Sequence, residues 1–86
     1  MEQITGPIHG FHLACYTTVT DDGHYGYAKI CDSRPTTVWD AGIGVRKVGM
    51  GPFPTEQEAL AAVQEETVRR LALKAAQLRY ALNPLR

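Results

Sequence analysis

The feature that most constrains this chain is its C-terminal third, which has the pattern of one long helix over Thr55–Leu82. Thr55 and Glu58 form a T-x-x-E capping box directly after Pro54, a typical helix start. The apolar stripe at helical spacing consists of Leu60, Val63, Thr67, Leu71, Ala75, Leu78 and Leu82. Asn83-Pro84 ends the pattern, because the residue before a proline disfavours the α conformation. The shorter segments upstream need an apolar partner, so we expect the helix to cover them.

Two β-strands are predicted upstream of the helix, over residues 11–20 and 24–32, where apolar and polar side chains alternate. A third short strand is predicted over residues 36–41, with residues 45–50 as its continuation or as a short fourth strand. Residues 1–10 are expected to be a loose lead-in. The predicted fold is therefore a single α+β domain over residues 1–86. Its sheet lies within residues 11–50 and is antiparallel, with three or four strands, and the helix over residues 55–82 packs on one face.

The first two strands are predicted to form a hairpin, because Asp22-Gly23 between them is a strong turn signal. A two-residue loop pairs Asp21 with His24, and hence Cys15 with Ile30. This register gathers the apolar residues on one face and places Cys15 and Cys31 on opposite faces, which excludes a disulfide between them. The centre of the core is expected to consist of Phe11, Leu13, Val19, Ile30, Phe53, Leu60, Val63 and Leu71.

Composition narrows the functional classes. Nine Lys and Arg residues balance nine Asp and Glu residues, which argues against a dedicated nucleic-acid binder and lowers the barrier to self-association. No apolar stretch approaches the ~18–20 residues of a membrane span. The first residues lack the pattern of a signal peptide, and two cysteines in such a chain are expected to be reduced thiols. A cytoplasmic protein without membrane contact is therefore expected.

The length of the predicted helix exceeds what the sheet can cover. About 27 helical residues span roughly 40 Å, whereas a strand of eight or nine residues spans about 27–30 Å. Leu78, Tyr80 and Leu82 fall in the overhang, where apolar side chains indicate a partner protein or a second copy of the chain. The alternative is a helix that breaks near Arg69-Arg70 and folds back.

Catalytic and metal-binding patterns are weak. His9, His12 and Cys15 have H-x-x-H-x-x-C spacing, but a strand directs His12 and Cys15 to opposite sides, and no second pair completes a zinc site. Cys31 is predicted to face outward near His12, yet no acidic group is placed to orient the histidine. We therefore expect no enzyme activity, no metal and no cofactor.

The outer face of the hairpin, away from the helix, is the strongest candidate for a binding surface. Its predicted residues are His12, Tyr16, Tyr25, Tyr27 and Lys29. Cross-strand tyrosines stabilise any half-exposed sheet, they are common at protein interfaces, and with a cation they can stack on nucleic-acid bases. These three interpretations stay open at this point.

Two short motifs carry a resemblance to known proteins. Gly23-His24-Tyr25 and the G-x-F-x-T-x-x-E-A junction that starts at Gly51 resemble those of small uncharacterised bacterial β-β-β-α proteins. The junction is also similar to that of the AP2-like amino-terminal domains of phage integrases. The resemblance implies three strands followed by a helix over most of residues 11–65. The integrase domains bind DNA through a basic sheet face, whereas Lys29 is the one cation predicted on this face, so DNA binding does not transfer.

The leading functional prediction is a non-catalytic interaction module that self-associates through the helix end or the tyrosine face. The alternative is a weak nucleic-acid binder that uses Tyr16, Tyr27 and Lys29 together with Arg69 and Arg70. A third hypothesis, an enzyme that uses Cys31, is the weakest of the three.

Overall fold

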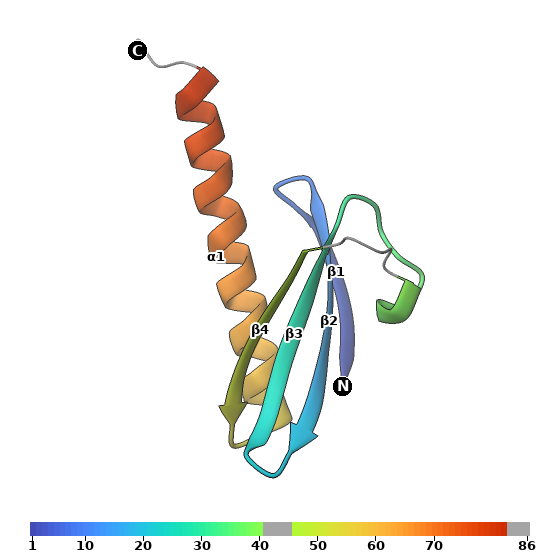
Figure 1. Cartoon of the computed structure of the whole chain (residues 1–86). Coiled ribbons are helices and arrows are strands. Elements are labelled where there is room, and N and C mark those ends of the chain that lie inside the picture. The colour runs from blue at the N-terminus through green and yellow to red at the C-terminus, as the bar shows by residue number, and fades with distance from the viewer. Residues whose placement is uncertain (41–45, 83–86) are drawn as a thin grey trace.

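The computed structural model describes the backbone of residues 1–40 and 46–82, and the side chains of residues 1–40 and 46–77. It is an α+β fold in which a four-stranded antiparallel sheet of order β1-β2-β3-β4 precedes one long helix (Figure 1). This confirms the predicted fold class. The elements are β1 (Glu2–Ile8), β2 (Phe11–Thr20), β3 (Gly23–Cys31), the 3-10 helix η1 (Val38–Asp40), β4 (Arg46–Phe53) and α1 (Glu56–Leu82). Within the described residues, no helix combines the length and apolar character of a membrane span.

The prediction of a loose lead-in is wrong, because residues Glu2–Ile8 form the edge strand β1. Ile8 pairs with Phe11, which leaves His9 and Gly10 as a two-residue turn. Both turn residues have positive φ, at 50° and 86°, as a type I′ hairpin requires. The segment resembles a loop in sequence because it contains Pro7, which an edge strand tolerates better than a central one.

The hairpin of β2 and β3 forms as predicted, but its register differs by two residues. Thr20 pairs with Gly23, and Cys15 pairs with Ala28, where the prediction paired Cys15 with Ile30. Side chains alternate with a period of two, so a two-residue shift leaves every side chain on its predicted face. Cys15 and Cys31 are both free and belong to apolar clusters on opposite faces of the sheet.

The predicted third strand is wrong for its described part, residues 36–40; its last residue, Ala41, lies outside the described residues. The backbone turns instead, with the Asp40 N–H donating to the Thr37 carbonyl at 3.1 Å. The turn buries Val38 against Ala14 and other residues of the outer sheet face. Packing of this one valine therefore outweighs the strand propensity of its neighbours.

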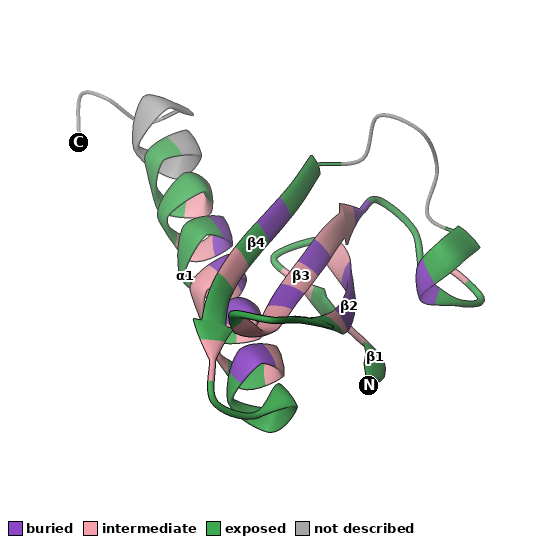
Figure 2. Ribbon diagram, turned by 60° about the horizontal axis from the view of Figure 1, so that its bottom comes forward, coloured by how far each residue is buried: buried purple, intermediate pink, exposed green. Residues whose placement is uncertain are grey.

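The start of α1 is capped as predicted, with the Glu58 N–H donating to Thr55 Oγ1 at 3.1 Å. The helix is continuous to Leu82, so it does not break near Arg69-Arg70. Its buried side faces the sheet (Figure 2). The main cluster under the helix consists of Leu13, Cys15, Ala28, Val48, Val63 and Leu71. Thr67 is also fully buried there, and its hydroxyl donates to the Val63 carbonyl at 2.6 Å.

The predicted core is correct except at one end of the hairpin. Leu13, Val63 and Leu71 are buried, and Phe11, Ile30 and Leu60 pack around them. Phe53 is half-buried. Val19 is 69% exposed, so its assignment to the core is wrong. Val19 lies on the predicted face of the sheet. It is close to the β2–β3 turn, however, where it pairs with His24.

Candidate binding surface on the outer face of the sheet

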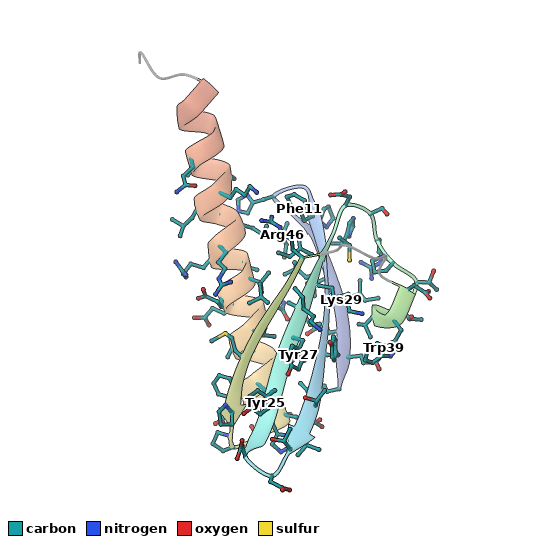
Figure 3. The ribbon with its side chains drawn as sticks, viewed as in Figure 1. Phe11, Tyr25, Tyr27, Lys29, Trp39 and Arg46 are labelled. Atoms are coloured by element: carbon teal, nitrogen blue, oxygen red, sulfur yellow. The ribbon has the colours of Figure 1, made fainter. Side chains whose placement is uncertain are left out.

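The sheet face opposite α1 carries a compact group of aromatic rings and lysines, which we call the aromatic–lysine cluster. Its members are Tyr16 on β2, Tyr27 and Lys29 on β3, Trp39 on η1, and Lys47 on β4. Tyr16 is the centre, because its ring stacks on Tyr27 at 5.2 Å between centroids and meets Trp39 at 4.8 Å with a 50° tilt. Figure 3 shows Tyr27, Lys29 and Trp39 on this side of the sheet.

The two lysines hold the rings together. Lys29 Nζ lies 5.5 Å from the Tyr16 ring centroid and 5.0 Å from that of Trp39, within cation–π distance of both. It also donates to the Val38 carbonyl at 3.0 Å, which ties η1 to the sheet. Lys47 Nζ lies 5.2 Å from the Tyr27 ring centroid and donates to the Tyr16 hydroxyl at 3.4 Å.

Trp39 is the most exposed aromatic ring of the cluster. Its side chain is 60% exposed, yet it is held at two points: its ring lies on Tyr16, and its Nε1–H donates to Glu2 Oε2 at 3.1 Å. Tyr16 itself is 7% exposed, since rings cover it from two sides. The cluster therefore presents an indole to solvent, while its central ring offers no free face.

Glycines on β4 provide the space for the tyrosine rings of β3. A Cβ on Gly49 would lie 2.9 Å from Tyr27 Cε1, and one on Gly51 would lie 2.5 Å from Tyr25 Cδ2. The rings thus lie directly over the β4 backbone. Gly49 and Gly51 therefore shape the candidate surface.

The structure brings three of the five predicted binding residues together, namely Tyr16, Tyr27 and Lys29. Tyr25 lies further along β3, over Gly51. His12 pairs with Cys31, four residues along β2 from Tyr16, and its Nδ1 is buried without a hydrogen-bond partner among the described residues.

Two members of the cluster were not predicted as site residues. Trp39 falls in the segment assigned to a strand, and only the turn at η1 shows where its ring lies. Lys47 pairs with Lys29 in the β3–β4 register, which places both lysines on the outer face. Alternation within residues 46–48 is the signal that could have found Lys47, because Val48 is buried and Lys47 is therefore on the other face.

The predicted oligomer contacts Leu78, Tyr80 and Leu82 have side chains outside the described residues. The backbone of α1 does continue through them, well past Leu71, the last described side chain that is buried. Leu73, five residues before Leu78, is described and is 51% exposed.

Both cysteines are in environments that favour the neutral thiol. Burial raises the pKa of Cys15 to about 11. For Cys31, burial again raises the pKa; nearby Lys29 lowers it and Asp32 raises it, with burial the largest cause. Neither side chain is thus activated as a thiolate. Among the described residues, no group of His, Cys, Asp and Glu side chains is arranged to hold a metal ion.

Comparison with known proteins adds no relative. No protein-family model, no curated protein and no solved structure matches this chain. The resemblance to small β-β-β-α proteins and to integrase amino-terminal domains therefore stays a prediction.

Proposed function

We propose that this protein is a non-catalytic interaction module, and that two copies associate through their outer sheet faces around Trp39. The observation that carries the proposal is the indole of Trp39, which is 60% exposed although its position is fixed. Tryptophan is among the residues that contribute most binding energy at protein interfaces.

The fixed position of Trp39 supports a binding role because it lowers the entropic cost of association. The ring already packs on Tyr16, and the hydrogen bond to Glu2 fixes its orientation. A flexible side chain would lose about 0.5–1.5 kcal/mol of conformational freedom on binding, and most of this cost is already met in the free protein.

The distribution of charge supports a second copy as the partner. Although the net charge is zero, the two ends of the molecule differ in sign. The β2–β3 turn and the start of α1 carry acids, and the opposite end, where β4 begins and α1 continues, carries bases (Figure 1). The acids are Asp21, Asp22, Glu56 and Glu58; the bases are Arg46, Arg70 and Lys74, with Asp32 as an exception among them. An antiparallel two-fold dimer brings the acidic end of each copy to the basic end of the other. The charges of the β2–β3 turn and of β4 lie nearest this contact, because α1 is on the opposite side of the sheet.

Sedimentation velocity across a range of protein concentrations tests this proposal. We expect a reversible dimer that weakens with added salt, and we expect Trp39→Ala to weaken it about 30-fold, the effect of removing a typical hot-spot side chain. The matched control is Leu73→Ala. Leu73 is also a large exposed apolar residue, but it lies on α1, so its removal should leave the dimer intact. A monomer at all concentrations, or a dimer lost only in Leu73→Ala, would contradict it.

Binding of single-stranded nucleic acid is a second candidate, and Lys47 is the observation that favours it, since it adds a second cation to the aromatic face. Two features weigh against it. Tyr16 has no free ring face for a base, and Arg69 and Arg70 lie on α1, across the sheet from the rings. Titration with a random oligonucleotide at about 50 mM salt, where phosphate contacts are strong, decides the matter. Absence of binding there removes this candidate.

A further inference from the structure

A second feature lies between β4 and α1, at the basic end of the molecule, and we call it the basic hollow. Its volume is about 150 Å³. It is lined by Ile30, Arg46, Lys47, Val48, Arg70, Leu71 and Lys74. Figure 3 shows Arg46 at this end of the sheet, where β4 begins. The basic hollow thus draws one cation, Arg46, from a strand and two, Arg70 and Lys74, from the helix. Lys47 lines it as well, but its ammonium group lies on the outer face of the sheet.

Among the described residues, the lining of the basic hollow contains no carboxylate that would balance its positive charges. Arg70 Nε binds Glu66 Oε2 at 2.7 Å, but Glu66 already binds Arg69 as well. Among the described residues, neither Arg46 nor Lys74 forms a salt bridge. Arg70 and Lys74 are also four residues apart on one helix, a spacing at which like charges repel. An anion in the hollow would offset this repulsion.

The floor of the basic hollow strengthens such an interaction. Val48 and Leu71 are buried, and Ile30 packs against the same cluster. Charges next to an apolar floor interact more strongly than charges surrounded by water. Two of the three cations are arginines, whose planar guanidinium groups can bind phosphate oxygens in a bidentate manner.

The size of the basic hollow limits what it can accept. Pockets for drug-sized ligands measure about 300–1,000 Å³, so a volume of about 150 Å³ suits a single small group. We propose that the basic hollow binds a phosphate group, supplied either by a small phosphate-bearing molecule or by a nucleic-acid backbone. This site is separate from the proposed dimer contact around Trp39 and goes beyond it.

The chain provides a matched pair of variants for the test. Arg69 and Arg70 are adjacent, both bind Glu66 with 2.7 Å contacts, and both are more than half exposed, but only Arg70 lines the basic hollow. Arg70→Gln and Arg69→Gln therefore change the net charge equally and each leave Glu66 with one arginine. Lys47 is left unchanged because its ammonium group belongs to the aromatic–lysine cluster.

The experiment is an NMR titration of the full chain with inorganic phosphate, and separately with a single-stranded oligonucleotide, with sodium chloride at matched ionic strength as the reference. We expect saturable shifts at residues 46–48 and 70–74, at least about tenfold weaker in Arg70→Gln and within about twofold of wild type in Arg69→Gln, because a charge-assisted hydrogen bond is lost only in the former. Saturation by inorganic phosphate indicates a small phosphate-bearing molecule. Saturation by the oligonucleotide alone, lost in Arg70→Gln, indicates a nucleic-acid backbone.

Three results overturn the proposal. The first is that neither probe produces saturable shifts beyond those of sodium chloride. The second is that both variants weaken binding equally, which would reflect net charge alone. The third is that the shifts map to Trp39 and its neighbours, away from the basic hollow.

Discussion

The two faces of the sheet are built from different chemistry, although each strand supplies both. The inner face is aliphatic and is covered by a regular helix, with Val63 and Leu71 buried against β2, β3 and β4. The outer face is aromatic and cationic, and the short η1 turn covers it through Val38. Alternating side chains along the strands thus form two apolar clusters, one on each face of the sheet. Only the aliphatic cluster is fully covered by another element. The other leaves Trp39 at the surface, which is where we propose that a second copy binds.

The sharpest way to break this comparison is to add one methyl group on each face. On the inner face, Gly26 faces the backbone of Ala59, and its Cβ would overlap that carbonyl and lie 3.0 Å from Val63 Cγ1. Gly26→Ala must therefore push the helix away from the sheet, and we expect a loss of about 3 kcal/mol or more of unfolding free energy in urea. On the outer face, Gly49→Ala displaces a tyrosine ring only, and we expect about 1–2 kcal/mol. An equal or reversed order would mean that the helix is not closely packed.

The same valine truncation on the two faces sharpens the comparison further. Val63 and Val38 are both almost fully buried, one under α1 and the other under η1. We expect Val63→Ala to cost about 2 kcal/mol of global stability, because its cavity lies in the main cluster. Val38→Ala is expected to cost about 1 kcal/mol and to increase the solvent exposure of Trp39, since η1 can detach locally. A larger global loss for Val38→Ala would show that the outer cluster is the main core.

Removal of the charge at Lys29 tests how η1 is held. Lys29→Met keeps an unbranched apolar side chain but loses two cation–π contacts and the hydrogen bond to the Val38 carbonyl. We expect a loss of about 1 kcal/mol and a red shift of tryptophan fluorescence. A spectrum identical to that of the wild type would mean that the lysine does not position Trp39.

The smallest predicted effect concerns pH and the solvent side of α1. Hydrogen bonds from Arg69 and then Arg70 lower the pKa of Glu66 to about 2, from an ordinary value of 4.5. Because the pKa is depressed in the folded state, the stabilisation is fully present above pH 4.5 and is lost as pH falls toward 2. Both arginines are more than half exposed, so solvent screens their pairing with Glu66, and we expect only a small loss of helix circular dichroism in this range. Glu66→Gln should flatten that part of the curve, and an unchanged curve would contradict the assignment.

The sequence predicts the inner face well and the outer face in part, for physical reasons. The helix, its cap at Thr55 and the two faces of each strand follow from local sequence patterns. The assignment of side chains to faces stays correct despite the two-residue error in the hairpin register. Strand β1 was not predicted, because Gly10 indicates a turn but does not show that a strand precedes it. In the aromatic–lysine cluster, Tyr16 and Tyr27 follow from alternation. Trp39 depends on the turn at η1, a packing choice that no local pattern encodes. Lys47 follows from alternation within residues 46–48 once they are assigned to a strand, but its place beside Lys29 depends on the β3–β4 register.

The central claim is that the outer face around Trp39 is the contact surface between two copies. Because Trp39 is the single tryptophan of the chain, its fluorescence reports on that surface alone. Acrylamide quenching of this fluorescence, followed from about 1 to 200 µM protein, covers the micromolar range of a weak dimer. We predict that quenching falls as the concentration rises, and that high salt restores it. Quenching that stays constant while sedimentation shows a dimer would place the contact elsewhere and contradict the claim.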